Sequence, residues 1–400
     1  MKNSILNRTY IKCLYLIATC TFLSFLSCGG GGGGGSGSST MFESATIDDL
    51  NDDGIPDVAI VSRHPSRVLL KFQDLLNPGN FSSTVEYRVG QQPFTVTTAD
   101  IDGDGLADLV TTNGLDDAIS VFLQDLSMPG NFLAANNFAT GDIPEDLAIG
   151  DLDGDSLVDI AIADDSLSIL FQDPASIGNF LPRTSLGIGS DSVAMGDLDG
   201  DLLADLASTS FNTGVVSILL QDPTTPGTFL PAVEYTVGDQ PIYVAIGDLN
   251  DDTLPDLAVA NAGKPAGGGN RGVSVLLQDQ SRPGNFLPAT DYIMGDEVDE
   301  VAIGDLNDDG RPDLAVAGQN AGSDDLNWAR VYVLFQDPAT PGSFFPPVGY
   351  KLDGFSSNSV AIGDLNEDTF NDILAATTEK VYILFQDSAN PGTFLKVRIH

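Results

Sequence analysis

The stretch VAIGDLNDDGRPDLAVA, residues Val301–Ala317, carries oxygen-bearing side chains at alternate positions of a nine-residue segment between two apolar arms. Counting Asp305 as place one, these side chains stand at places one, three, five and nine, with Gly310 at place six. A tight loop turns alternate side chains inward, so the four oxygens converge on one point. Hard cations that take about six to eight oxygen ligands suit such a point, and Ca²⁺ suits it better than Mg²⁺, which retains more water.

The segment occurs seven times, and we name the copies Asp loops 1 to 7. Their first residues are 51, 51, 46, 51, 57 and 59 positions apart. Seven copies in register favour calcium binding over the alternative of acidic turns without a metal, because the specificity of a short motif grows with repetition. The predicted calcium ligands are Asp49, Asn51, Asp53 and Asp57; Asp100, Asp102, Asp104 and Asp108; Asp151, Asp153, Asp155 and Asp159; Asp197, Asp199, Asp201 and Asp205; Asp248, Asn250, Asp252 and Asp256; Asp305, Asn307, Asp309 and Asp313; and Asp364, Asn366, Asp368 and Asp372.

Place six separates the copies into two groups. Loops 1, 2 and 6 have glycine there, whereas loops 3, 4, 5 and 7 have Ser156, Leu202, Thr253 and Thr369. Glycine adopts a positive φ at the least cost, so a sharp turn at this place favours it. We therefore predict up to seven calcium sites, with the strongest in loops 1, 2 and 6.

Residues 1–28 are expected to lie outside the fold as a signal peptide. Lys2, Arg8 and Lys12 precede an apolar run, Cys13–Ser27, that is short for a membrane span and suits an exported leader. The run ends at Cys28, which resembles the lipidated cysteine of a bacterial lipoprotein, although ordinary cleavage near this point remains open. Residues 29–43 are predicted to form a Gly/Ser-rich tether. The chain is thus expected in the cell envelope, as an outer-membrane or cell-surface lipoprotein held by an N-terminal lipid anchor.

The charge of the chain excludes one class of partner. The 57 acidic and 17 basic residues give a net charge of −40, and loss of residues 1–28 removes three basic residues and no acidic ones. Such an acidic protein is not expected to bind nucleic acid. All three cysteines lie within residues 1–28, so no disulfide is expected in the remaining chain.

Residues 44–400 read as one unit repeated seven times. After each Asp loop come a second strand, a connection, and a third strand that ends in Gln-Asp, at Gln73, Gln124, Gln172, Gln221, Gln278, Gln336 and Gln386. A turn of the form Pro-Gly-x-Phe usually follows (Ile177-Gly178 replaces Pro-Gly in the third unit), and then a fourth strand. Four short strands in about 50 residues are typical of a propeller blade. We therefore predict an all-β fold, a seven-bladed β-propeller of four-stranded antiparallel blades, over an open solenoid.

The repeated unit resembles the FG-GAP/VCBS repeat family, which includes the propellers of integrin alpha chains. The resemblance rests on the nine-residue Asp loops and covers essentially all of Ser44–His400. It implies calcium in the loops that join the first and second strands of each blade, and it implies adhesion or ligand binding at the cell surface. The departures from glycine at place six put the occupancy of four sites, but not the fold, in question.

Because the strands of a blade are antiparallel, successive connections lie alternately on the two faces of such a ring, a rule that we call strand parity. The Asp loops and the Pro-Gly-x-Phe turns share one face, and the connections between second and third strands lie on the other. The two long insertions, Asn261–Gly272 and Gly318–Arg330, are connections of the latter kind. Trp328, the sole tryptophan, lies in the second insertion and is predicted to contact a protein or glycan ligand. The alternative is an indole that packs its own loop.

Nothing in the sequence indicates catalysis. Outside residues 1–28 the chain has two histidines and no cysteine, and it has no Gly-x-Ser-x-Gly motif. No catalytic residue is predicted, because the well-placed carboxylates are explained as calcium ligands. We expect a surface binding or adhesion module that is not an enzyme. A carbohydrate-active lyase or hydrolase, and a structural envelope protein, are the alternatives.

Overall fold

The computed structural model describes residues 40–82, 84–263, 270–319, 328–354 and 356–400. This part of the chain forms 28 strands in seven four-stranded sheets, and it includes no helix long and apolar enough to cross a membrane. The predicted signal peptide, Cys28 and most of the tether lie outside the described residues. The first strand begins at Met41, a few positions ahead of the predicted start of the propeller.

Each sheet consists of four strands that follow one another along the chain. Blades 1 to 4 contain β1 (Met41–Asp48), β2 (Asp57–His64), β3 (Arg67–Lys71) and β4 (Val85–Arg88); β5 (Pro93–Ala99), β6 (Asp108–Asn113), β7 (Ala118–Phe122) and β8 (Asn136–Ala139); β9 (Asp146–Gly150), β10 (Asp159–Ala163), β11 (Ser168–Leu170) and β12 (Thr184–Ser185); and β13 (Ser192–Gly196), β14 (Asp205–Ser210), β15 (Val215–Leu219) and β16 (Val233–Thr236). Blades 5 to 7 contain β17 (Pro241–Gly247), β18 (Asp256–Asn261), β19 (Gly272–Leu276) and β20 (Thr290–Ile293); β21 (Glu297–Gly304), β22 (Asp313–Gln319), β23 (Ala329–Leu334) and β24 (Val348–Lys351); and β25 (Ser357–Gly363), β26 (Asp372–Thr377), β27 (Val381–Gln386) and β28 (Phe394–Arg398).

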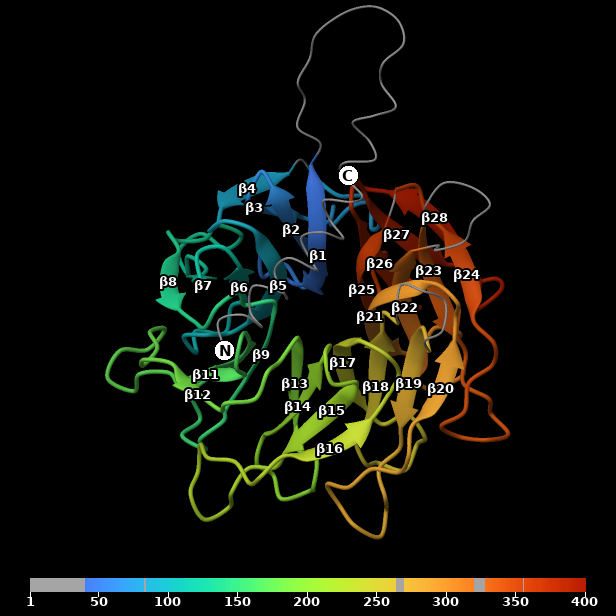
Figure 1. Cartoon of the computed structure of the whole chain (residues 1–400). Helices are drawn as coiled ribbons and strands as arrows, with labels where there is room; N and C mark the ends of the chain where they lie inside the picture. The colour runs from blue at the N-terminus through green and yellow to red at the C-terminus, as the bar shows by residue number, and fades with distance from the viewer. Residues whose placement is uncertain (1–39, 83, 264–269, 320–327, 355) are drawn as a thin grey trace, which may run out of the picture. The chain divides into compact units, whose positions relative to one another are not determined.

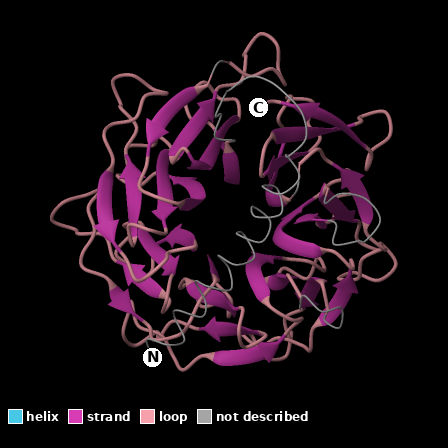
Figure 2. Ribbon diagram, turned by 45° about the horizontal axis from the view of Figure 1, so that its top comes forward, coloured by secondary structure: helices cyan, strands magenta, loops and turns pink. Residues whose placement is uncertain are grey.

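The seven sheets stand around one axis as a closed ring, so the structure is a seven-bladed β-propeller, as predicted (Figure 1, Figure 2). Within every blade the strands pair antiparallel in chain order, from an inner first strand to an outer fourth strand. The sequence pattern follows this order. Second strands such as β18 are buried along their whole length, whereas outer strands such as β20 are exposed at all residues but a tyrosine.

Apolar side chains fill the spaces between blades rather than one central core. Seven buried clusters account for the seven contacts between neighbouring blades. The first strands crowd at the axis, where a Cβ on Gly304 would come within 2.9 Å of Ile362 in the next blade. This crowding explains the small residues of the Ala-Ile-Gly segments.

The ring closes between blades 1 and 7 without exchanging a strand. The backbone N–H of Phe42 donates to the carbonyl of Thr378 at 3.3 Å, and the Asn358 amide donates to the carbonyl of Phe42 at 2.7 Å. Phe42 is fully buried and packs edge-on against His400, with ring centroids 5.1 Å apart. Packing between the first and last blades therefore replaces a shared sheet.

Candidate metal centres

Each Asp loop connects the first and second strands of its blade, and its second residue fixes it to the body of the propeller. Place two is Leu or Ile in every copy and is buried in all of them: Leu50, Ile101, Leu152, Leu198, Leu249, Leu306 and Leu365. The side chains at places one and three, on either side of this residue, remain half-buried at the surface. One apolar anchor thus keeps the neighbouring side chains near the surface.

The ninth-place Asp holds the loop to the rest of the blade through both carboxylate oxygens. In loop 6, the Leu306 N–H donates to one oxygen of Asp313 at 2.9 Å, and the Gln336 N–H donates to the other at 2.8 Å. The same pair of bonds occurs in all seven loops, at 2.7–3.1 Å. These residues are almost fully buried, so this carboxylate has a structural role in addition to the predicted ligand role.

The first-place Asp shapes the loop from inside. In loop 5, one oxygen of Asp248 accepts the N–H groups of Asn250 and Asp252 at 3.2 and 3.1 Å, and the other accepts the Thr253 N–H at 2.8 Å. The bond from place six is present in every copy. The carboxylate therefore sets the curvature that directs alternate side chains inward.

All seven loops have the same backbone conformation, including those without glycine at place six. The φ angle at this place is positive throughout: 86° at Gly54, 92° at Gly105, 69° at Ser156, 71° at Leu202, 71° at Thr253, 80° at Gly310 and 74° at Thr369. Place four also has a positive φ in every copy, at Asp52, Gly103, Gly154, Gly200, Asp251, Asp308 and Glu367. The non-glycine residues keep the loop at a cost in backbone strain.

The carboxylates at places one, three and nine converge, whereas the predicted ligand at place five is in none of the groups of converging acids among the described residues. In loops 2, 3 and 4 the acids at places one, three and nine bring one oxygen each to within 4.8 Å of the others, so each triad could hold a metal ion. Loops 1, 5, 6 and 7 have Asn at place three and offer an amide oxygen there. Oxygen-only donor sets of this kind suit a hard cation.

Burial and, to a smaller extent, neighbouring charges raise the pKa of several acids in the Asp loops. Burial raises the pKa of the ninth-place carboxyls to about 7 for Asp57, Asp256, Asp313 and Asp372, and to about 6 for Asp108, Asp159 and Asp205. Partial burial, and then the charges of Asp104 and Asp100, raises the pKa of Asp102. A cation at the cluster would favour the ionised form of each carboxylate, so metal binding would release protons.

The glutamine of the Gln-Asp dipeptide is a site residue that the sequence analysis used only as a marker. The Gln124 side chain donates to the carbonyl of Ala107, at place eight of loop 2, at 2.8 Å. Its side-chain oxygen accepts the N–H of Gly130, in the Pro-Gly-x-Phe turn, also at 2.8 Å. One amide thus ties the Asp loop to the turn of the same blade. Its occurrence in all seven units was the signal for this role.

Turns also contact the Asp loop of the preceding blade. A Cβ on Gly227, in the turn of blade 4, would lie 3.1 Å from Cβ of Asp153, at place three of loop 3. The corresponding glycines of the other turns approach Asn51, Asp102, Asp199, Asn250, Asn307 and Asn366. Loops and turns therefore alternate around one end of the ring, which we call the Asp-loop face. This placement confirms the predicted sharing of a face.

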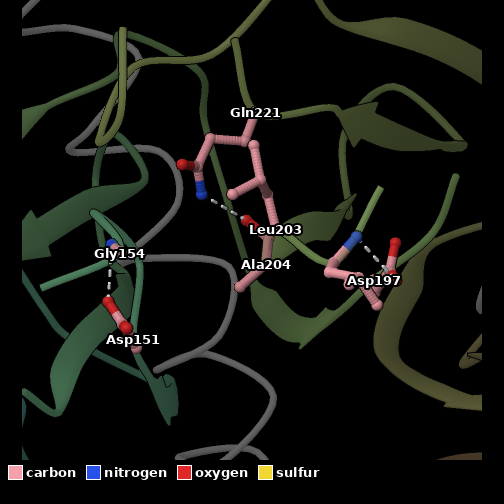
Figure 3. A pocket seen from close by; sticks show the side chains of 7 residues that line it. Asp151, Gly154, Asp197, Leu203, Ala204 and Gln221 are labelled. Atoms are coloured by element: carbon pink, nitrogen blue, oxygen red, sulfur yellow. Dashed lines mark hydrogen bonds between the residues drawn. The ribbon is translucent and has the colours of Figure 1, made fainter. Parts of the chain in front are cut away.

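A hollow of about 220 Å³ lies between loops 3 and 4 on this face (Figure 3). Asp151 and Asp197 line it, together with Leu202, Leu203 and Gln221. In Figure 3 the Gly154 N–H donates to Asp151, and the Gln221 amide donates to the carbonyl of Ala204. The hollow is therefore bounded by two predicted metal loops and by the amide that supports one of them.

The described ends of the two insertions lie at the opposite end of the ring from the Asp loops, as strand parity predicts. Their end residues belong to β18, β19, β22 and β23, and residues 264–269 and 320–327 lie outside the described residues. Trp328 immediately precedes β23 and is half-buried. The Lys351 ammonium lies 3.4 Å from its ring centroid, so one face of the indole is covered by a cation.

Comparisons with known proteins agree with this architecture. The FG-GAP-like repeat model matches residues 49–111, 100–162, 197–259 and 248–316, which together make up more than half of the chain. A search of curated proteins gave no match. A solved structure titled "Crystal structure of BBS1N in complex with ARL6DN, soaked with mercury" is similar to this chain with a TM-score of 0.56 and 13% identity, over 89% of this chain and 95% of that one. At this identity the similarity shows the fold alone. Because the repeat model matches over most of the propeller, the chain belongs to the FG-GAP-like repeat family.

Proposed function

We propose that this protein is a calcium-binding propeller that acts as a binding or adhesion module at the cell surface and has no catalytic activity. The observation that carries the proposal is the repetition of one loop geometry seven times, with first- and ninth-place carboxylates held by the same backbone donors. Loops that differ at places three, four and six keep this geometry. FG-GAP-like repeats are typical of extracellular and cell-surface proteins, which supports the location.

Calcium fits these loops because they concentrate negative charge with few basic partners. Loops 1 to 5 and 7 contain no Lys or Arg, and loop 6 contains only Arg311, which lies 3.7 Å from Asp251 of loop 5 and from Asp309. Their acids therefore repel one another until cations bind. Binding to the folded state alone stabilises it by RT ln(1 + [L]/Kd), and with a Kd typical of extracellular modules millimolar Ca²⁺ contributes on the order of 1 kcal/mol per occupied site.

Calorimetric titration of the metal-depleted chain with Ca²⁺, together with its melting temperature, tests the proposal. We expect several bound ions and a higher melting temperature in Ca²⁺ than in chelator, with a smaller effect of Mg²⁺. Within loop 6, Asp309→Asn alters a predicted ligand, and Asp308→Asn makes the same charge change one residue away. Only the first should reduce the number of tightly bound ions. Equal melting temperatures in chelator and in Ca²⁺ would contradict the proposal.

The ligand-binding part of the proposal rests on Trp328 and on the insertions beside it. An aromatic side chain next to a length-variable connection on a rigid scaffold is a common anchor for a protein or glycan. A glycan array should identify a carbohydrate ligand, and Trp328→Ala should then weaken its binding by about 1–3 kcal/mol without changing the calcium effect on melting. Unchanged binding together with lower stability would make the indole a packing residue. A polysaccharide-depletion assay tests the absence of catalysis.

We also propose that Cys28 carries a lipid that anchors the protein in the cell envelope. The wild-type chain should partition into the detergent phase with membranes, and Cys28→Ala should release it or stall its processing. A wholly soluble wild-type protein with a mature N-terminus elsewhere would exclude the anchor.

A further inference from the structure

Basic residues of this acidic protein gather on the outer strands of three neighbouring blades. Among the described third and fourth strands, those of blades 6, 7 and 1 contain Lys or Arg, and those of blades 2 to 5 contain neither. Six cations lie where these strands reach the face opposite the Asp loops, and we call them the basic rim: Arg67, Arg88, Arg330, Lys351, Lys380 and Arg398. In a chain with a net charge of −40, such a local excess of positive charge calls for an explanation.

Like charges directly oppose each other within the basic rim. Arg67 on β3 is opposite Arg88 on β4, and Arg330 on β23 is opposite Lys351 on β24. The corresponding pairs in blades 2, 4 and 5 are uncharged: Ala118 with Ala139, Val215 with Thr236, and Gly272 with Ile293. Like charges at directly opposed positions destabilise a sheet, so the fold itself does not favour the charged pairs.

The rim is continuous from blade 6 to blade 1. The Lys396 ammonium on β28 donates to the carbonyl of Lys351 on β24 at 3.2 Å, so the outer strands of blades 6 and 7 lie side by side (Figure 1). At the next seam, burial and then the charges of three cations of blades 1 and 7, Lys71 first, lower the pKa of His400. Cations of blades 7 and 1 therefore lie close enough to act on one group.

Acids neutralise only part of the rim. Three rim cations have an acidic partner: Arg67 with Glu86, Arg330 with Asp296, and Lys380 with Asp353. Among the described residues, Arg88 and Lys351 form no ion pair, and both are exposed. Arg183 and Arg271, which lie beside the outer strands of blades 3 and 5, are each paired with an acid. Cations with no local acidic partner are thus a feature of the rim.

The aromatic anchor of the proposed function lies in the same place. The Lys351 ammonium is 3.4 Å from the ring centroid of Trp328. A ligand that contacts the indole therefore also meets this ammonium, and a carboxylate or sulfate on the ligand would be complementary to it.

Acids elsewhere on this face limit the shape of an anionic partner. Asp116, Asp117, Asp142 and Asp165 are exposed on connections of blades 2 and 3. A bilayer or another broad anionic surface laid on this face would meet these acids as well as the rim. A narrow chain can follow the rim alone, and anionic groups repeated along it match cations repeated from blade to blade.

We propose that the basic rim binds an anionic polysaccharide, whose carboxylate or sulfate groups pair with Arg88, Lys351 and Arg398 and whose sugar rings contact Trp328. The inference rests on the ligand-binding part of the proposed function and names the class of its ligand. It does not require calcium, because no residue of the rim belongs to an Asp loop.

Affinity chromatography of the full chain on immobilised polygalacturonate and dextran sulfate, with neutral dextran as the reference, tests this proposal. We expect retention on an anionic resin, elution by salt, and no retention on neutral dextran. The resin that retains the protein identifies the anionic group as carboxylate or sulfate. Arg88→Gln/Lys351→Gln should weaken binding about tenfold or more at low salt. The matched control, Arg183→Gln/Arg282→Gln, removes the same charge from blades 3 and 5 and should leave binding unchanged.

Other results would overturn the inference. Equal weakening in the two double variants would mean that net charge alone governs retention. Binding that is lost in chelator would assign the contact to the Asp loops. Tighter binding of an oligonucleotide or of phosphatidylserine vesicles would make the partner another class of polyanion.

Two further results separate this inference from the proposed function. A neutral glycan that depends on Trp328 and still binds Arg88→Gln/Lys351→Gln would overturn the anionic class and leave the proposed function intact. Absence of retention on both anionic resins would overturn the inference, while the calcium titration described above decides independently on the calcium-binding propeller.

Discussion

The two ends of the propeller are built in different ways. On the Asp-loop face, seven copies of one loop and one turn repeat the same hydrogen bonds with nearly constant lengths. On the opposite face the connections differ in length and have individual contacts, such as Arg271 with Glu297 at 3.0 Å and Arg183 with Asp164 at 3.4 Å. The connections at one end thus repeat the same contacts in every blade, whereas the contacts at the other end differ from blade to blade.

This difference separates structural from adaptable carboxylates. An acid on the Asp-loop face belongs to a network that runs from loop to glutamine to turn and on to the next blade. Acids on the opposite face differ in burial: Asp164 is buried in its pair with Arg183, whereas Asp353 is exposed, and exposed pairs contribute little to stability. A ninth-place Asp and an exposed Asp of the opposite face should therefore respond very differently to removal.

The largest effect is expected when a ninth-place carboxylate is removed. Asp313→Ala leaves the buried N–H groups of Leu306 and Gln336 without acceptors, which should cost about 3 kcal/mol or more in the free energy of unfolding even in chelator. Chemical denaturation in chelator measures this loss without any contribution from calcium.

The matched control for this prediction lies on the opposite face. Asp353 is exposed, pairs with Lys380 and Lys396 at 3.7 and 3.8 Å, and accepts a hydrogen bond from the Tyr382 hydroxyl at 3.1 Å. Asp353→Ala should change the free energy of unfolding by less than about 1 kcal/mol. Similar losses for the two variants would show that the buried network does not distinguish the faces.

An intermediate effect is expected at the inner strands. Burial raises the pKa of Glu300 to about 8, and the charges of Asp146 and Asp299 raise it further. Hydrogen bonds from Ser359 and Val360 lower it, but by less. The unfolded chain loses this proton near pH 4.5 and the folded chain near pH 8. The contribution of Glu300 to stability is therefore greatest below about pH 4.5 and falls as the pH rises from about 4.5 to about 8.

Glu300→Gln has no proton to lose and should avoid this fall. In chelator at pH 8, the variant should be more stable than the wild type by on the order of 2 kcal/mol, and at pH 4 the two should be alike. Melting temperatures over this pH range measure the difference. Parallel curves would mean that Glu300 has the same pKa in the folded and unfolded states.

The sequence predicted the repeated end of the molecule far better than the other. The blade number and the sharing of a face follow from the repeated unit, and both are present in the structure. Of the four predicted ligand places, places one, three and nine converge in loops 2, 3 and 4. Contacts between repeat units, in contrast, produce no recognisable pattern of residues in the sequence. The packing of Gly227 on Asp153 joins residues of different blades and depends on how the sheets are arranged. The positive φ at place four was also missed, although glycine at that place in loops 2, 3 and 4 (Gly103, Gly154 and Gly200) was a signal for it.

The smallest effect concerns the residue at place six, and it tests the ranking of loops 1, 2 and 6 as the strongest sites. Thr253 and Gly310 have φ angles of 71° and 80° in neighbouring blades, so Thr253→Gly and Gly310→Thr are reciprocal changes in one conformation. A β-branched residue at positive φ is strained, and glycine relieves this strain but adds freedom to the unfolded chain. Net changes of about 0.5–1 kcal/mol are expected, stabilising for the first variant and destabilising for the second.

Because both loops already have this conformation in the folded protein, the strain accompanies folding rather than metal binding. Calcium affinity should therefore change little in either variant, while the melting temperatures in chelator move in opposite directions. If Thr253→Gly instead tightens calcium binding, glycine at place six contributes to the site itself, and the ranking of the loops by this residue holds.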